Sequence, residues 1–368
     1  MASFVLGGGR LSCFIGMKSH KDRIFSFRSG QIQQKRVPSD AVVILHVERP
    51  VYGGTALARH SGKVCFVQGA IPGEIVEARI TEEKSDYLCA RTVTVLKPST
   101  DRIAPHCQAY GVCGGCQQQH ISYTRQVALK EEILVDVLRR IGHLEPVLSA
   151  PFVDDNPWAY RHRAQMKCDG EHVGFYQASS RMVVDIDACP VLIDDISWVF
   201  TKIRSFLSHK RGLSGALSGI HLVGNNHVVA GSCYLRKGIN VPMYELEAVV
   251  DQLGLQGLSV YSSKQSTPQQ IGNPLIVFDL LGMSYTIAAG SFFQGHWRLN
   301  QQVVAYVRDI LQPLDGKCIL DLYAGSGNFS LPLAAEGAAV IAVEEDRAAI
   351  AAGIANAADN HIHDIRFV

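Results

Sequence analysis

Apolar and polar residues alternate in short runs between residues 38 and 97. Runs such as Val64-Cys65-Phe66-Val67 and Ile75-Val76-Glu77-Ala78 are separated by glycine-bearing turns, as at Pro72-Gly73. A period of two with closely spaced turns is typical of half-buried β-strands. Five such strands in about sixty residues predict a small closed barrel of the OB type, a fold that often binds single-stranded nucleic acid.

A helical period replaces this alternation at two places. Between Ser122 and Ile141, apolar residues recur at helical spacing, Ser122 can cap the start and Gly142 follows the end. A second helix is predicted from about Arg298 to Leu311. Its apolar stripe consists of Leu299, Val303, Val307, Ile310 and Leu311.

Strand patterns dominate residues 157–290. The runs Arg161 to Cys168, Val173 to Tyr176 and Met182 to Ile186 are followed by a hairpin around Gly224-Asn225-Asn226. Basic and apolar residues alternate in the first run, so we expect one basic face that suits phosphate groups. These basic residues are Arg161, His162, Arg163 and Lys167. The region is predicted to be a mixed α+β domain.

A βαβ unit is predicted from Cys318 to Glu344. An apolar run leads into a glycine-rich turn, a helix-forming segment follows, and a second apolar run ends at Glu344. Gly325 and Gly327 allow a sharp turn and a close approach to a ligand. Glu344 falls about 20 residues later, where a carboxylate can accept the hydroxyls of a ribose. The unit therefore predicts an adenosine-bearing cofactor.

The details of this turn favour S-adenosylmethionine (SAM). A dinucleotide fingerprint requires a third glycine at the position that Ser330 occupies. Asp321, four positions before the first glycine, suits a cofactor that carries an ammonium group and no pyrophosphate. NAD, FAD and a structural turn without a ligand are the alternatives that the motif leaves open.

Composition and charge limit the function classes. The 368 residues suffice for two or three domains, and 47% hydrophobic content suffices for buried cores. A formal charge of +1 creates no global field for nucleic acid, so RNA contacts must come from local patches. The barrel offers Arg49, Arg59, Lys63, Arg79, Lys84 and Arg91, which equally suit a solvated surface. No apolar run approaches the length of a membrane span, which predicts a soluble protein.

Three cysteines crowd together at Cys107, Cys113 and Cys116, with two glycines between the last two. Thiolates this close can point at a common ion, and Cys189, followed by a proline, is the best fourth ligand. Three local cysteines and a distant one favour a 4Fe-4S cluster; zinc and free thiols are the alternatives. Such a centre indicates a reducing, cytoplasmic compartment. The isolated cysteines are predicted to be small core residues: Cys13, Cys65, Cys89, Cys168, Cys233 and Cys318.

Residues 1–37 are basic and rich in serine, which predicts a disordered extension or a misassigned start, with an organelle transit peptide as the alternative. The predicted division is then a basic extension (1–37), a barrel (38–97), a central α+β domain with the cysteine loop (98–289), and the first part of an α/β Rossmann-like domain (290–368).

Four features, in this order, resemble the RNA uracil-5-methyltransferases, which make 5-methyluridine in ribosomal or transfer RNA. The stretch from Gly53 to Glu74 is similar to their TRAM barrel, and the cysteine loop with Gln119-His120 is similar to their iron-sulfur loop. Ser291-Phe292-Phe293-Gln294 and the stretch from Leu320 to Phe329 are similar to their cofactor motifs. The resemblance extends from about residue 40 to the last residue.

The resemblance implies a multidomain enzyme that transfers a methyl group from SAM to carbon 5 of a uridine in structured RNA. It favours 23S ribosomal RNA over transfer RNA, because the TRAM barrel and the cysteine loop are both present. It implies that the target uridine is flipped out of the RNA, and we expect a monomer. The cofactor residues that it implies are Gln294, Tyr323, Asn328 and Glu344, in addition to Gly325 in the turn.

The family adds a cysteine thiolate to carbon 6 of uracil and later removes the carbon-5 proton with a base. These residues lie after an Asp-Pro-Pro segment, and the chain ends at Val368, in or just before a third strand. We therefore assign no catalytic residue, expect the nucleophile and base beyond residue 368, and predict an inactive truncated chain. The alternatives are a non-catalytic RNA-binding remnant and a methyltransferase that acts on a small molecule.

Overall fold

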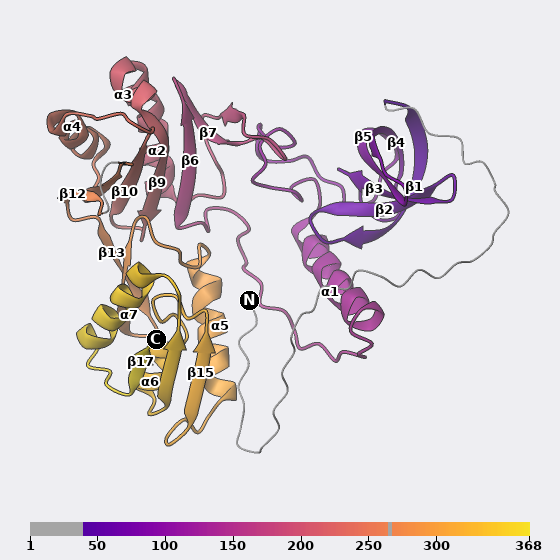
Figure 1. The fold of residues 1–368 in the computed structure, drawn as a ribbon. Helices are drawn as coiled ribbons and strands as arrows, with labels where there is room; N and C mark the ends of the chain where they lie inside the picture. The colour runs from indigo at the N-terminus through magenta and orange to yellow at the C-terminus, as the bar shows by residue number, and fades with distance from the viewer. Residues whose placement is uncertain (1–39, 264–266) are drawn as a thin grey trace. The chain divides into compact units, whose positions relative to one another are not determined.

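The structure is a computed structural model that describes residues 40–263 and 267–368 (Figure 1). These residues form two compact units, residues 40–100 and residues 101–368. The predicted basic extension, including Cys13, lies outside the described residues. No helix within the described ranges is long and apolar enough to cross a membrane.

The first unit is a closed five-stranded barrel, as the alternating pattern predicts. Its strands are paired in the order β1-β2-β3-β5-β4, with β3 and β5 parallel and the other pairs antiparallel. Alternate side chains such as Leu45, Val67 and Ile80 fill the interior and are fully buried. The strands are β1 (Val42–Val51), β2 (Thr55–His60), β3 (Lys63–Gln68), β4 (Ile75–Glu83) and β5 (Tyr87–Lys97).

The second unit begins with a loop and helix α1 (Tyr123–Arg140). The helix is one residue shorter at each end than predicted, and Leu129 is its buried residue. The Ser122 hydroxyl donates a hydrogen bond to Asp101 instead of capping the helix, so the predicted cap is wrong. Val137 and Ile141, two of the apolar residues that recur at helical spacing, are exposed.

The centre of this unit is a seven-stranded sheet in the order β12-β11-β10-β9-β6-β7-β8. Helices α2 (Asp194–Ser208), α3 (Arg211–Ala216) and α4 (Met243–Leu253) cover one face and build the largest apolar core with it (Figure 1). The predicted hairpin is confirmed, since β9 and β10 pair antiparallel around Asn225-Asn226. The strands are β6 (Arg163–Asp169), β7 (His172–Tyr176), β8 (Val183–Asp185), β9 (Leu217–Gly224), β10 (Val229–Leu235), β11 (Gly257–Tyr261) and β12 (Gln269–Gly272).

The other face of this sheet carries polar and aromatic side chains. Strand β6 alternates, with Ala164, Met166 and Cys168 turned to the helices and Arg163 and Lys167 on the opposite face. The predicted basic face is wrong for Arg161 and His162, which precede the strand, and His162 is buried. Cross-strand pairing places Gln165 beside His221, His221 beside Ser232, and Tyr234 beside Tyr261. We call this surface the polar sheet face; its residues are Arg163, Gln165, Lys167, His221, Ser232, Tyr234, Ser259 and Tyr261.

The last part of the chain is a small Rossmann-like sheet preceded by the hairpin β13 (Leu275–Leu280) and β14 (Met283–Ala288) and by helix α5 (Trp297–Ile310). Strands β15 (Cys318–Leu322), β16 (Ala339–Val343) and β17 (Ile365–Phe367) are parallel and adjacent, with α6 (Ser330–Ala335) and α7 (Arg347–Asp359) between them. The last residues form the third strand, in agreement with the expectation that Val368 lies in or just before it.

Helix α5 shows how a stripe can be misread. The helix lies where it was predicted, but its buried residues are Trp297, Asn300 and Val304. Ile310, a member of the predicted stripe, is 59% exposed. The core therefore selects a neighbouring face of the same helix.

The burial of His221 predicts an acid-sensitive fold. The pKa of His221 is lowered to about 4, first by burial and then by the charges of Lys167 and Arg163. Between about pH 6.5 and pH 4, His221 is therefore protonated in the unfolded chain and neutral in the folded chain. The free energy of unfolding falls over this range as the pH drops, by up to about 3 kcal/mol. We expect His221→Gln to flatten the fall of the melting temperature over this range. Parallel pH profiles of the two proteins would contradict this.

Candidate functional site

The glycine-rich turn after β15 has the backbone that its sequence requires. Tyr323, Gly325 and Gly327 have φ of 64°, 58° and 92°, in the left-handed region that favours glycine. A Cβ on Gly327 would lie 2.8 Å from Leu331 Cγ, whereas a Cβ on Gly325 would meet no atom within 4 Å. Gly327 thus allows the turn to pack on α6, and Gly325 leaves open space for a ligand.

Glu344 follows β16 and reaches back to this turn. Its Oε2 accepts a hydrogen bond from the Gly325 N–H at 2.9 Å, and its Oε1 accepts from Glu345 and Asp346 at 2.9 and 3.0 Å. Glu344 and Gly325 lie side by side because the parallel strands β15 and β16, which precede them, end at the same edge of the sheet. Three backbone N–H groups therefore fix the Glu344 carboxylate beside the glycine-rich turn.

Asp321 does not line the open turn. Its side chain is buried and Oδ2 accepts a hydrogen bond from the Ser330 hydroxyl at 2.6 Å. Burial raises the pKa of this carboxyl. The expectation that Asp321 holds an ammonium group is therefore not supported, because its carboxylate is engaged at the start of α6.

An amide pair joins the turn to helix α5. Asn300 Nδ2 donates to Asn328 Oδ1 at 2.7 Å, and Asn328 Nδ2 donates to Asn300 Oδ1 at 3.0 Å. Tyr285 and Ser326 share a second hydrogen bond of 2.5 Å beneath the same turn. Sequence reasoning missed Asn300; its signal was a polar residue that lies on the buried face of a helix.

The remaining predicted cofactor residues have exposed side chains. Tyr323 is 75% exposed, and Gln294 is also exposed. Of the aromatic pair before Gln294, Phe293 is buried in the core and Phe292 is 63% exposed. The structure thus brings Gly325 together with Glu344, and leaves Tyr323 and Gln294 accessible from solvent.

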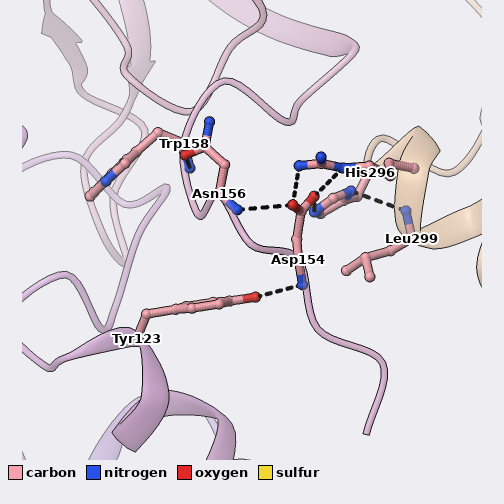
Figure 2. A network of polar contacts seen from close by, with 7 residues as sticks. Tyr123, Asp154, Asn156, Trp158, His296 and Leu299 are labelled. Carbon is pink, nitrogen blue, oxygen red and sulfur yellow. Dashed lines mark hydrogen bonds and ion pairs between the residues drawn. The ribbon is translucent and has the colours of Figure 1, made fainter.

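A buried carboxylate fixes the start of α5 (Figure 2). The Asp154 side chain is 1% exposed and receives hydrogen bonds from Arg298, whose Nε lies 2.8 Å from Oδ2 and whose second nitrogen bonds Oδ1. The Asn156 N–H donates to Oδ1 at 3.0 Å, and the Asp154 N–H donates to the Tyr123 hydroxyl at 3.2 Å. The Asp154 carboxylate therefore ties the segment before β6 to α5, and the Asp154 backbone N–H adds a bond to Tyr123 of α1.

His296 completes this network in its neutral form. Its Nδ1 accepts a hydrogen bond from the Leu299 N–H at 3.4 Å, which caps α5. Its Nε2 lies 3.2 Å from Asp154 Oδ2, so the proton belongs on Nε2. Burial lowers the pKa of His296, and the opposing effect of Asp154 is smaller. Arg298 is then the cation that balances Asp154.

The cysteine loop and Cys189 lie close enough to interact electrostatically. The pKa of Cys189 is raised to about 11, mainly by burial and further by the thiols of Cys116, Cys107 and Cys113. The Gly114 N–H donates to the Tyr176 carbonyl at 2.9 Å, which attaches the loop to β7. Within residues 40–263 and 267–368, however, no group of three or more His, Cys, Asp or Glu side chains is arranged to hold a metal ion. The cluster stays a prediction.

The isolated cysteines divide by environment. Cys65, Cys168 and Cys233 are buried, as predicted, and Cys89 is half-buried. Cys318 is exposed, because it occupies the amino end of β15 on the uncovered face. The prediction of a core position is wrong for Cys318.

The fold is similar to that of the Pyrococcus abyssi tRNA (uracil-54, C5)-methyltransferase. The TM-score is 0.68 at 20% sequence identity, and the match covers 88% of this chain and 79% of that chain. The described chain thus has the fold of a Rossmann-like methyltransferase, and a TRAM domain model matches its barrel at residues 42–93.

The family follows from sequence comparison. A family model described as tRNA (Uracil-5-)-methyltransferase matches residues 122–368. A Shewanella amazonensis protein named 23S rRNA (uracil(1939)-C(5))-methyltransferase RlmD is 32% identical over 336 residues, which are 88% of this chain and 75% of that protein. A Methylococcus capsulatus protein of the same name is 33% identical, with 91% and 78% covered. The chain belongs to the RNA uracil-5-methyltransferase family.

The fraction of each relative's length that the chain covers is relevant to the predicted truncation. The chain covers three quarters of the length of both relatives, 75% and 78%. They do not support the prediction of an inactive fragment, and the family match does not favour the RNA-binding remnant.

Asp154 provides a test of the network in Figure 2. We expect Asp154→Asn to lower stability by about 2 to 3 kcal/mol, because the new amide turns an N–H toward donors of Arg298 or His296. Arg298 is 58% exposed, which keeps the loss below that of a fully buried pair. Differential scanning fluorimetry should show a melting temperature about 5–10 °C lower. Asp155→Asn, at the exposed neighbour, is the control, and equal shifts in both variants would contradict the assignment.

Proposed function

We propose that the protein methylates carbon 5 of a uridine in structured RNA, with SAM as the methyl donor. The observation that carries the proposal is the pairing of Glu344 with the Gly325 N–H at 2.9 Å, at the open end of the β15–β16 pair. The names of the relatives favour 23S ribosomal RNA over transfer RNA as the substrate. The TRAM barrel and the central domain bind this RNA.

SAM supplies an electrophilic methyl group, and residues of this chain hold and orient it. The Glu344 carboxylate accepts hydrogen bonds from the ribose hydroxyls, a role that suits a carboxylate at this edge of the sheet. The open space at Gly325 lets the backbone approach the cofactor. Asn328, fixed by Asn300, and the accessible side chains of Tyr323 and Gln294 provide the remaining contacts.

No described residue is assigned as the nucleophile or the base. The cysteine of the Rossmann-like part in the described chain is Cys318, at the amino end of β15. The glycine-rich turn lies at the other end of that strand, so the Cys318 thiol cannot reach a uracil ring placed beside the cofactor.

A 4Fe-4S cluster on Cys107, Cys113, Cys116 and Cys189 is part of the proposal. Its support is that the thiols of Cys116, Cys107 and Cys113 lie close enough to raise the pKa of Cys189, and that thiolates are the preferred ligands of iron-sulfur clusters. The cluster would tie the loop before α1 to the segment before α2, which is a structural role rather than a redox role.

The predicted division of the chain is kept in this proposal. Its parts are residues 1–37, 38–97, 98–289 and 290–368, as the sequence patterns define them. A cytoplasmic monomer suits reduced thiols and an RNA substrate.

Nucleoside analysis tests the proposed function. RNA incubated with the protein and methyl-labelled SAM is digested to nucleosides and separated by mass spectrometry. We expect any transferred label in 5-methyluridine, and label in another nucleoside would contradict the proposal. SAM and RNA binding without any label would instead revive the prediction of an inactive chain.

Glu344 is tested by cofactor affinity. Glu344→Gln should weaken SAM binding about 10- to 100-fold in isothermal titration calorimetry, because hydrogen bonds to a charged acceptor contribute about 1.5–3 kcal/mol. Glu345→Gln changes an exposed neighbour in the same way and should bind SAM normally. If the two variants bind SAM equally well, Glu344 does not hold the cofactor.

Iron content tests the cluster. Protein purified without oxygen should contain about four iron atoms per chain, and Cys189→Ser should lose most of them. Cys318→Ser, which removes an exposed thiol elsewhere, should keep its iron. Zinc in place of iron, or iron retained in Cys189→Ser, would exclude the proposed ligand set.

A further inference from the structure

The polar sheet face contains a row of rings that crosses three strands. The rings of His221 and Tyr234 have centroids 4.4 Å apart, and those of Tyr234 and Tyr261 are stacked at 4.9 Å with an interplanar angle of 8°. Tyr234 on β10 is the direct cross-strand partner of Tyr261 on β11. Both tyrosines are half-buried, so part of each ring is open to solvent.

Cations flank this row. Arg163 lies on β6 of the same face and its guanidinium is 5.7 Å from the centre of the exposed Phe292 ring. Lys167 lies four residues further along β6, and its Nζ is 5.6 Å from the centre of the Tyr176 ring. Aromatic rings interleaved with basic groups are the composition that binds the bases and phosphates of single-stranded nucleic acid.

Unpartnered polar atoms provide a second, independent observation. His221 Nδ1, Ser232 Oγ and Arg163 Nε are buried and have no hydrogen-bond partner within the described part of the chain. His221 is 8% exposed and Ser232 is fully buried. Buried atoms of this kind are rare and cost about 1–3 kcal/mol each when unsatisfied. Three such atoms beneath the ring row leave this face with polar groups that the described residues do not satisfy.

The row ends near the candidate cofactor site. The pKa of Tyr261 is raised, first by burial and then by the charge of Asp346, which lies two residues after Glu344. The Tyr261 hydroxyl lies against Gly290, where a Cβ would approach it to 2.5 Å, close in sequence to Gln294. A strand of RNA on this face would therefore continue toward the methyl donor.

We propose that the polar sheet face binds a single-stranded segment of the RNA substrate, with bases stacked on the Tyr234–Tyr261 row and phosphates beside Arg163 and Lys167. This inference rests on the proposed function and adds to it the part of the central domain that holds the strand. The other face of the sheet is filled by α2, α3 and α4, and the core that contains the β13–β14 hairpin covers the polar sheet face at Val223 and Ala230, so only the remainder of this face is available in the described chain. A basic, ring-bearing surface suits RNA better than an apolar protein partner.

Fluorescence anisotropy with a labelled single-stranded RNA tests the inference on the full chain. Tyr234→Ala and Tyr261→Ala should each weaken binding about tenfold, because base stacking contributes about 1–3 kcal/mol. Tyr234→Phe and Tyr261→Phe keep the rings and should bind within about twofold of the natural chain. Tyr244→Ala removes a 68% exposed tyrosine on α4, on the helical side, and should have no effect.

Photo-crosslinking adds a readout that a structural role would not change. RNA carrying 4-thiouridine should crosslink to peptides of β10 and β11. Unchanged RNA affinity in the Tyr234→Ala, Tyr261→Ala double variant, with the melting temperature preserved, would overturn the inference and leave the proposed function intact. A natural chain that binds SAM but no RNA would overturn both. Crosslinks confined to the barrel would overturn the inference alone.

Discussion

The second unit depends on one desolvated carboxylate. Asp154 is almost fully buried, and such a charge is tolerated only when both oxygens are satisfied. Arg298, His296 and the Asn156 N–H supply four donors, two for each oxygen. In the neutral tautomer of His296, Nδ1 caps α5 while Nε2 binds the Asp154 carboxylate. Because these donors come from distant segments, the start of α5 has only one position that satisfies them.

That position is transmitted to the cofactor turn through short polar contacts. Helix α5 presents Asn300 to Asn328, and the turn that contains Asn328 is closed from the other side by Glu344 on Gly325. The site is therefore held from both ends before any ligand arrives. Preorganisation of this kind reduces the entropy that a bound cofactor would otherwise lose.

Local sequence determined the parts of this arrangement that are local. The glycine-rich turn and Glu344 could be predicted together, because parallel strands must end at one edge. Asp154 could not, since Asp154 and Asp155 look alike in sequence, and packing against Arg298, 144 residues away, decides which is buried. The face of α5 was misread for the same reason: neighbouring elements select Asn300 rather than the apolar stripe beside it. The polar sheet face was partly predictable, because alternation in β6 marked its basic residues, whereas the rings came from strands that pair only in the fold.

The most direct measurement is a crystal structure of this chain with S-adenosylhomocysteine bound. The account predicts that the ribose hydroxyls lie on the Glu344 carboxylate, that the adenosine lies beside the glycine-rich turn at Gly325, and that the Asn300–Asn328 pair is unchanged. A cofactor bound elsewhere, or a Glu344 carboxylate that makes no contact with the ribose, would contradict the central claim.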